Sequence, residues 1–427
     1  MKVAFHTLGC KVNQNDSSNL MILFRERGYE IVPFDATADV YVINTCAVTQ
    51  VGERKSRQMI RKAIGANPEA VIAVTGCYAQ TAPQELAGIP GINLVIGMAD
   101  RHRIVELVEE FRQTHRNMVR VASTAELTAW QDLPVGAVGD RTRVTLKIEE
   151  GCDQFCSYCI VPYARGRVRS MPPDQVVEKM RVLAEQGYRE VVLTGIHLGS
   201  YGKDLNHTLN QLLREILKVP GNFRIRLGSI DPHEIDGDLI DTIVNQRRIC
   251  QFLHIPLQSG SSRILQLMNR HYTCEEYTGL LRALREKNPL IAIGTDLIVG
   301  FPGETEHDFD EIANYVRDQA FSRIHVFRYS PRKGTPAFQM PGRVPASEQE
   351  IRSHRIQEIG NRSAAEFARK FIGRTVEVLF EEREETQWHG LSGEYLRVNV
   401  ESKSNLKNKL ILVKIVGAEA GILHGIC

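Results

Sequence analysis

The sequence predicts an α/β protein with three parts: an N-terminal open parallel sheet, a central partial (β/α)6 barrel and a C-terminal small β-barrel. Two observations lead to this fold class. Short apolar runs alternate with amphipathic helical patterns along most of the 427 residues, which is typical of parallel sheets covered by helices. Short strands separated by turns then fill residues 371–427, which is typical of a small barrel.

The composition is ordinary for a globular protein, with 43% hydrophobic and 24% charged residues. A net charge of +2 neither requires nor excludes a nucleic-acid partner, because a phosphate-binding face can be local. No apolar run reaches the ~18 residues of a membrane span. The start of the chain lacks the apolar stretch of a signal peptide. We therefore expect a cytoplasmic protein.

The N-terminal domain is predicted to cover residues 1–112. Helical patterns at 17–28 and 53–65 alternate there with short apolar runs, as in an open, mostly parallel sheet. Residues 113–137 show no clear periodicity, and we interpret them as a linker. The runs predicted as strands are 3–8, 30–34, 40–45, 70–75 and 94–97.

A second series of βα units is predicted to fill residues 138–369, with a long polar helix starting at residue 346. Six units predict an incomplete relative of the eight-unit barrel. A polar, glycine-rich segment follows each strand, at the end where β/α barrels carry their active sites. The predicted strands are 144–149, 190–194, 223–228, 251–255, 291–299 and 323–329.

Six of the nine cysteines fall into two groups of three. In the first group, Cys10, Cys46 and Cys77, each cysteine stands just past the carboxyl end of a predicted strand. Ligands bind at this edge of open α/β sheets, so the three residues can converge on one ligand. The alternative is that three buried cysteines end these strands by chance. The remaining cysteines are interpreted as buried or incidental thiols: Cys250, Cys274 and Cys427.

The second group, Cys152, Cys156 and Cys159, directly follows a strand in the segment EEGCDQFCSYCIVP. A zinc site would need a fourth ligand such as His197 or His254, and zinc sites normally show paired CxxC spacing. Iron–sulfur clusters are also held by Cys thiolates. Because a cubane cluster has four irons, three thiolates would leave one iron for a substrate or cofactor.

This spacing, with an aromatic residue before the last cysteine, resembles the radical S-adenosylmethionine family, whose core is also an incomplete barrel. The resemblance implies a [4Fe-4S] cluster on these three cysteines, with S-adenosylmethionine on the open iron. An electron from the cluster would cleave the cofactor to a 5′-deoxyadenosyl radical. The cofactor contacts that the resemblance implies are Tyr158, Thr194, Gly195, Ser229 and Gln258.

Further segments resemble the methylthiotransferases of that family, in order along nearly the whole chain. The resemblance implies a second [4Fe-4S] cluster on Cys10, Cys46 and Cys77 that holds the sulfur to be inserted. One S-adenosylmethionine would methylate the sulfur, and another would supply the radical for a C–H bond that no ordinary base can deprotonate. The matching segments include TLGCKVNQ (7–14), VINTCAVT (42–49), VTGCYAQ (74–80), HIPLQSGS (254–261) and FRYSPRKGTPA (327–337).

The family has three main bacterial-type branches, which act on isopentenyladenosine of tRNA, on threonylcarbamoyladenosine of tRNA and on an aspartate of a ribosomal protein. The segment GCKVNQ (9–14) resembles the second branch, because the others typically read GCQMN and GCPKN. NDSSNL (15–20) departs from that branch, which often has an acidic residue and a tyrosine there. We expect methylthiolation at C2 of N6-threonylcarbamoyladenosine at tRNA position 37, with the other two substrates and a zinc-bound RNA-binding scaffold as alternatives.

Residues 370–427 resemble a TRAM domain, a small RNA-binding β-barrel, through HGLSGEYLRVNV (389–400). Residues 371–427 carry seven Lys or Arg against eight Glu, so charge alone does not indicate RNA binding, and a structural cap is the alternative. Expected partners are the tRNA anticodon stem–loop, an electron donor such as a flavodoxin or ferredoxin, and an unidentified sulfur donor. The candidate RNA contacts, which a solvated surface would also explain, are Arg54, Arg57, Arg61, Arg165, Arg167, Arg169 and Arg397.

Overall fold

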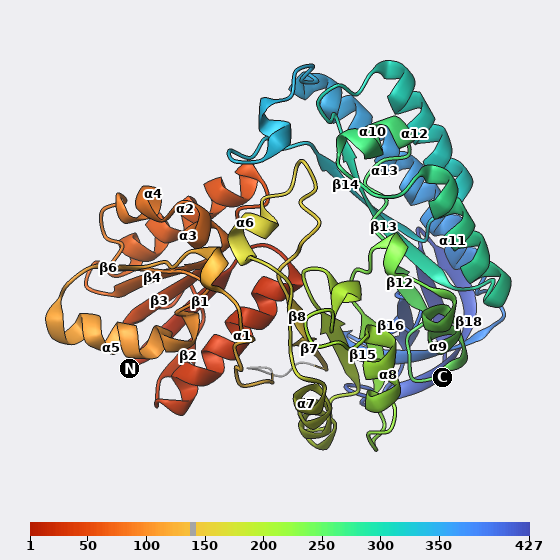
Figure 1. The fold of residues 1–427 in the computed structure, drawn as a ribbon. Coiled ribbons are helices and arrows are strands. Elements are labelled where there is room, and N and C mark those ends of the chain that lie inside the picture. The colour runs from red at the N-terminus through yellow and green to blue at the C-terminus, as the bar shows by residue number, and fades with distance from the viewer. Residues whose placement is uncertain (137–141) are drawn as a thin grey trace.

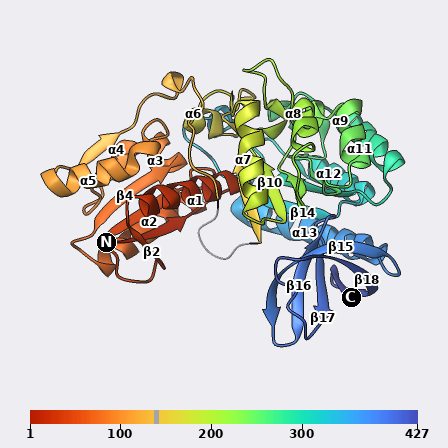
Figure 2. The ribbon, with the colours of Figure 1, turned by 90° about the horizontal axis from the view of Figure 1, so that it is seen from below.

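The computed structural model describes residues 1–136 and 142–427, and it confirms the predicted fold class. The N-terminal part (red to orange) lies beside the central barrel in Figure 1, and Figure 2 shows the C-terminal barrel (blue) packed against the central part. Within the described ranges, no helix is long and apolar enough to cross a membrane. The predicted boundary between residues 137 and 138 lies outside the described residues.

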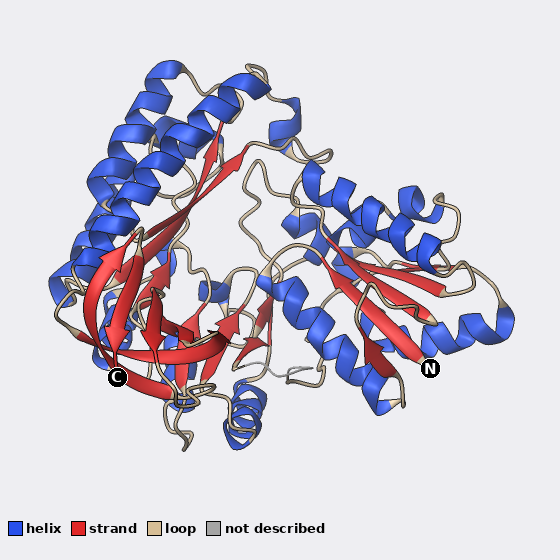
Figure 3. Cartoon of the chain, turned by 180° about the vertical axis from the view of Figure 1, so that it is seen from behind, coloured by secondary structure: helices blue, strands red, loops and turns tan. Residues whose placement is uncertain are grey.

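The N-terminal sheet has six parallel strands in the order β2-β1-β3-β4-β5-β6. Its central strands β3 and β4 are buried along their whole length, because helices cover both faces (Figure 3). The strands are β1 (Lys2–Thr7), β2 (Glu30–Val32), β3 (Val40–Thr45), β4 (Val71–Gly76), β5 (Leu94–Ile96) and β6 (Met118–Arg120). The helices are α1 (Lys11–Glu26), α2 (Gln50–Ala66), α3 (Cys77–Thr81), α4 (Pro83–Ala87), η1 (Arg101–Arg103) and α5 (Ile104–Thr114).

The predicted linker, residues 113–137, needs correction at its start. Helix α5 runs on to Thr114, and β6 adds a sixth strand by pairing in parallel with β5. This strand is only three residues long and mostly exposed, so it carries little of the apolar periodicity that would reveal a strand. A short helix, η2 (Thr124–Glu126), follows it.

The central part is an incomplete barrel made of two three-stranded parallel sheets, β11-β10-β7 and β12-β13-β14. Isolated bridges, Ile225 to Ile249 and Ser229 to His254, join the two halves. The barrel strands are β7 (Arg143–Lys147), β10 (Glu190–Thr194), β11 (Arg224–Leu227), β12 (Phe252–His254), β13 (Ala292–Val299) and β14 (Arg323–Arg328). A separate antiparallel pair consists of β8 (Glu149–Glu150) and β9 (Arg169–Ser170).

Helices cover the outside of this barrel, as Figure 3 shows, and the last of them leads to the C-terminal part. The α-helices are α6 (Val161–Arg165), α7 (Pro173–Glu185), α8 (Leu209–Ile216), α9 (Gly237–Asn245), α10 (Ser262–Leu267), α11 (Cys274–Lys287), α12 (Glu306–Gln319) and α13 (Ala346–Arg369). The short 3-10 helices are η3 (Leu198–Ser200), η4 (Pro232–Glu234) and η5 (Pro336–Gln339).

The C-terminal part is a closed five-stranded barrel in the order β15-β16-β17-β19-β18. Two buried arginines of β11 fix it to the central barrel. Arg224 donates to Leu391 O at 2.7 Å, and Arg226 donates to Ser392 O at 2.9 Å, while Glu190 accepts from both guanidinium groups. The strands are β15 (Thr375–Glu384), β16 (Gln387–Ser392), β17 (Arg397–Glu401), β18 (Leu410–Glu419) and β19 (Ile422–Ile426).

Candidate functional site

Cys10, Cys46 and Cys77 lie together at the carboxyl edge of the N-terminal sheet. They follow the adjacent strands β1, β3 and β4, as their positions in the sequence predict. Gly9 adopts a φ of +101°, and a Cβ added there would lie 3.1 Å from Cys46 Sγ, so the chain passes close to that sulfur atom. Cys46 and Cys77 are buried, whereas Cys10 is exposed.

Burial raises the pKa of the Cys46 thiol to about 11, and the nearby Cys77 and Cys10 add to the effect. Burial also raises the pKa of Cys77, but Arg165 opposes this shift because its Nε donates to Cys77 Sγ at 3.4 Å. A cation next to a thiol favours the thiolate, which is the form that binds metals.

Cys152, Cys156 and Cys159 lie in the loop between β8 and α6, where the turn is held by a 2.9 Å bond from Cys159 N to Cys156 O. This loop starts at Gly151, whose φ is +94°. A Cβ at Gly151 would lie 1.9 Å from Arg167 O, so only glycine fits there.

Arg270 is the main polar neighbour of this second cysteine group. Its Nη1 donates to Cys156 Sγ at 3.3 Å, and its Nη2 forms an ion pair with Asp231. His197 Nδ1 lies 3.8 Å from Cys152 Sγ, but it also lies 2.9 Å from Ser200 Oγ. His197 Nδ1 thus already has a hydrogen-bond partner in Ser200.

N–H groups point at the sulfur atoms of both groups, and this fits thiolates that hold iron–sulfur clusters. Hydrogen bonds to the sulfurs stabilise such thiolates and tune their clusters. Besides Arg165 and Arg270, backbone N–H groups contribute: Val48 N donates to Cys46 Sγ and Gln154 N donates to Cys152 Sγ, both at 3.5 Å.

Arg165 sits between the two cysteine groups and belongs to a buried network of five charged side chains. Its Nη1 donates to Glu150 at 2.6 Å, and its Nη2 donates to Asp16 at 3.0 Å. Lys147 and Arg101 contact the same two carboxylates. Although burial alone would raise the pKa values of Asp16 and Glu150, the three cations lower both below the ordinary range. The network therefore holds three cations against two carboxylates.

A cavity of about 200 Å³ lies between the two groups. Its lining includes Cys159 from the central part and Val48 from the loop that follows Cys46. The charge of Cys77 also raises the pKa of Cys159, although burial is the main cause of that rise to about 12. The cavity is therefore bordered by Cys159 on one side and by the loop that follows Cys46 on the other.

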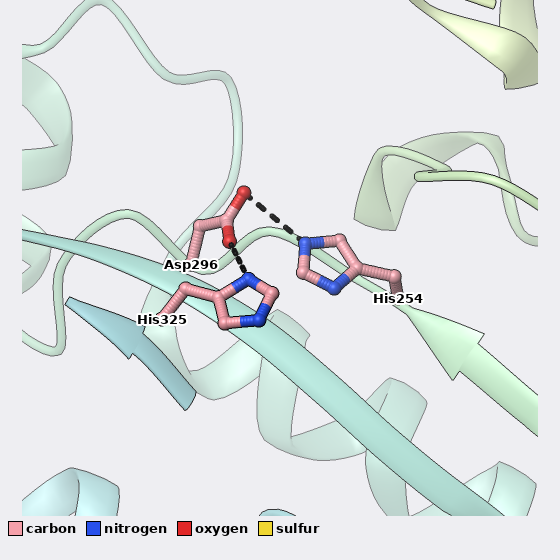
Figure 4. Close-up of side chains that lie close together, drawn as sticks. All are labelled: His254, Asp296 and His325. Carbon is pink, nitrogen blue, oxygen red and sulfur yellow. Dashed lines mark hydrogen bonds and ion pairs between the residues drawn. The ribbon is translucent and has the colours of Figure 1, made fainter. Parts of the chain in front are cut away.

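His254, Asp296 and His325 form a cluster inside the barrel (Figure 4), with possible ligand atoms within 4.8 Å of one another. Arg323 Nε donates to His325 Nε2 at 2.9 Å, which assigns the His325 proton to Nδ1, facing Asp296 at 3.2 Å. His254 Nε2 lies 3.1 Å from the other carboxylate oxygen. Burial would raise the pKa of Asp296, but both histidines lower it. The geometry is that of a hydrogen-bonded triad in which the two carboxylate oxygens of Asp296 each face one imidazole ring.

The residues that the sequence suggests as cofactor contacts occupy three places. Tyr158 and Gln258 line the cavity between the cysteine groups, together with Asp296. Thr194 ends β10 and Gly195 follows it, where an added Cβ would lie 2.4 Å from Glu149 Oε2. Ser229 lies on the bridge to His254 that joins the two halves of the barrel.

Two of the suggested RNA contacts need correction. Arg165 is 0% exposed and Arg169 is 6% exposed, so neither can reach a phosphate on an RNA surface. Arg57 is half-buried and donates to Tyr78 Oη at 2.6 Å. The exposed members of the set are Arg54, Arg61, Arg167 and Arg397.

Several site residues were not foreseen, namely Asp16, Lys147, Arg270 and His325. The polar start of α1 offered a signal, because Asn13, Asn15 and Asp16 stand where a surface helix would place some apolar residues, and all three are buried. Buried polar side chains need partners. The sequence around Arg270 does not indicate its role at the site, because its partners Cys156 and Asp231 are far away in the sequence.

Known proteins resemble this chain over nearly its whole length. Residues 2–97 match Uncharacterized protein family UPF0004, and residues 146–316 match the Radical SAM superfamily. The threonylcarbamoyladenosine tRNA methylthiotransferase MtaB of Bacillus subtilis is 42% identical over 97% of this chain and 94% of its own length. The tRNA-2-methylthio-N(6)-dimethylallyladenosine synthase of Moorella thermoacetica is 37% identical over 98% of this chain and 96% of its own length.

Among solved structures, the radical S-adenosylmethionine methyltransferase TsrM of Kitasatospora setae is similar in fold. The TM-score is 0.58 at 16% sequence identity, and the match covers 90% of this chain and 79% of TsrM. At this identity the likeness concerns the fold alone.

We predict that Gly151→Ala destabilises the protein more than a matched substitution at Gly187. Both glycines have a positive φ, but a Cβ at Gly187 meets no atom within 4 Å. The backbone cost of about 1 kcal/mol applies to both, and the clash with Arg167 O should add roughly 2 kcal/mol at Gly151. Chemical denaturation of the two variants measures the difference. Equal losses would show that the loop can relax around the extra atom.

Proposed function

This chain belongs to the radical S-adenosylmethionine methylthiotransferases, and we propose that it transfers a methylthio group to C2 of N6-threonylcarbamoyladenosine at position 37 of tRNA. Three curated relatives with this substrate in their names are 42%, 41% and 36% identical to the chain, and the dimethylallyladenosine enzyme of Moorella thermoacetica is 37% identical. The segment GCKVNQ (9–14) supports the same substrate.

The cavity between the two cysteine groups supports this proposal most directly. Sulfur insertion needs a radical source and a sulfur carrier on either side of the same carbon atom. Cys159 and the loop after Cys46 line one cavity of about 200 Å³, so a base that enters it would lie beside Cys159 and beside Val48, two residues after Cys46. We assign one [4Fe-4S] cluster to Cys152, Cys156 and Cys159, and a second to the three cysteines of the N-terminal sheet.

When bound, the clusters and S-adenosylmethionine would supply the radical and the methylated sulfur. The protein's own residues then bind and orient the cofactor and the substrate, and they exclude water. Arg270 and Arg165 donate hydrogen bonds to sulfur atoms of the two groups. Asp296, fixed by two histidines, faces the cavity and can orient a base edge or a ribose hydroxyl.

The exposed arginines Arg54 and Arg61 of α2 are the proposed phosphate contacts near the second cluster, and Arg167 and Arg397 would extend this surface. Arg54 and Arg61 are spaced i and i+7, so they point the same way from the helix that starts four residues after Cys46. The proposed substrate implies a cytoplasmic enzyme and an external electron donor such as a flavodoxin or ferredoxin.

Reconstituted protein should convert threonylcarbamoyladenosine to its 2-methylthio form in tRNA when S-adenosylmethionine and a reductant are present. Mass spectrometry of the tRNA nucleosides measures the product. A variant with alanine at Cys10, Cys46 and Cys77 should still form 5′-deoxyadenosine but no product. Modification of isopentenyladenosine instead would assign the chain to the other tRNA branch and reject the proposed substrate.

Alanine at both Arg54 and Arg61 should reduce the salt dependence of tRNA binding. Each lost phosphate contact lowers the slope of log K against log salt by roughly 0.7, so the double variant should lose about 1.4. Titrations at several salt concentrations give the slope. The double alanine variant of Arg181 and Arg317, two other exposed arginines, is the control. An unchanged slope in the Arg54/Arg61 variant removes this helix from the RNA footprint.

A further inference from the structure

A second, larger hollow of about 570 Å³ lies where the three parts of the protein meet. Helix α1 contributes Lys11, and β11 contributes Arg226. The C-terminal barrel contributes Tyr395, whose ring stacks on Phe252 with centroids 4.7 Å apart. The hollow is therefore built from all three parts, and none of the reactions described above uses it.

Positive charge gathers around the Tyr395 ring. Arg226 Cζ lies 4.7 Å from the ring centroid, Arg323 Cζ lies 5.2 Å away and Lys11 Nζ lies 5.7 Å away. Burial would raise the pKa of Tyr395, but these cations and Arg143 lower it below its ordinary value. Three cations are therefore grouped around one ring at the edge of the hollow.

Only part of this positive charge is balanced. Arg226 pairs with Glu190, and Arg143 pairs with Glu381 at 2.7 Å. Glu382 also lines the hollow. Among the residues that the structure describes, no carboxylate lies within 4.0 Å of the charged groups of Lys11 or Arg323. These two cations can thus accept an anion from outside without breaking an existing ion pair.

Two of the cations around the Tyr395 ring, Lys11 and Arg323, are linked to residues of the proposed reaction site. Lys11 directly follows Cys10, one of the proposed ligands of the sulfur-carrying cluster. Arg323 Nε donates to His325, and His325 contacts Asp296, which lines the reaction cavity. Lys11 is thus joined to the reaction site through the backbone of Cys10, and Arg323 is joined to it through His325 and Asp296.

We propose that Lys11 and Arg323 bind the carboxylate of the threonylcarbamoyl group and so select this modified adenosine. The substituent ends in the free α-carboxylate of threonine, whereas an isopentenyl group is an uncharged hydrocarbon. A carboxylate in a partly enclosed site gains most from charge-assisted hydrogen bonds to Lys and Arg. This inference rests on the proposed function and adds the residues that recognise its substrate.

The test compares the binding of three anticodon stem–loops to the reconstituted protein, with no reductant present so that no turnover occurs. The first carries threonylcarbamoyladenosine at position 37, the second carries its methyl ester and the third carries unmodified adenosine. The ester keeps the size of the group but removes its charge. The protein variants are Lys11→Gln and Arg323→Gln, and Lys218→Gln is a control at an exposed lysine elsewhere. Iron content is measured for each, because Lys11 adjoins Cys10.

The wild-type protein should prefer the carboxylate form to its ester by tenfold or more, as expected for a charge-assisted hydrogen bond. Each Gln variant should lose most of this preference and bind the ester and the unmodified RNA as before. If all three RNAs weaken equally, the cations bind backbone phosphate and the proposal is wrong. An unchanged preference would also reject it. A wild-type protein that makes the 2-methylthio product but shows no preference rejects this inference alone.

Discussion

A buried network of five charged side chains joins the N-terminal sheet to the central barrel, and the positions of both cysteine groups depend on it. Asp16 and Arg101 come from the first part, whereas Lys147, Glu150 and Arg165 come from the second. Buried charges are tolerated only when they are paired, and removing one partner of such a pair typically costs about 3–5 kcal/mol. The two parts therefore cannot separate without leaving several charges unpaired.

The same network sets the chemical environment of the sulfur atoms. Glu150 stands two residues before Cys152, and Arg165 donates to Cys77 Sγ. Three cations against two carboxylates leave one positive charge beside the N-terminal cysteines. That excess opposes the rise in the pKa of Cys77 that burial causes, because a nearby cation stabilises a thiolate. The charged network that joins the two parts thus also favours binding of a metal cluster by the N-terminal group of cysteines.

Sequence reasoning located the six cysteines well, because their placement follows from local strand patterns and from the rule that parallel strands gather their carboxyl ends at one edge. It failed for Arg165 and Arg169, because a run of arginines looks the same whether it faces solvent or a buried carboxylate. Both residues are buried, and Arg165 has Asp16 as a partner 149 residues away. A single sequence does not reveal such pairings.

The inner surface of the barrel was equally hard to predict. Asp296 lies inside a buried strand, and its partners His254 and His325 come from two other strands. Tyr395 reaches the central part from the C-terminal barrel, which the sequence suggested only as an RNA-binding module or a cap. These contacts join segments that are distant in the sequence, and local patterns of hydrophobicity do not predict them. The wider consequence is that the C-terminal barrel helps to build the hollow around Tyr395.

The central claim is that each cysteine group holds its own four-iron cluster beside one shared cavity. Iron and sulfide analysis after anaerobic reconstitution tests it most directly. We predict roughly eight irons per chain for the wild-type protein and about four for each variant with alanine at one complete group of three cysteines. Stoichiometric zinc, or the loss of all eight irons when either group is replaced, would contradict the account.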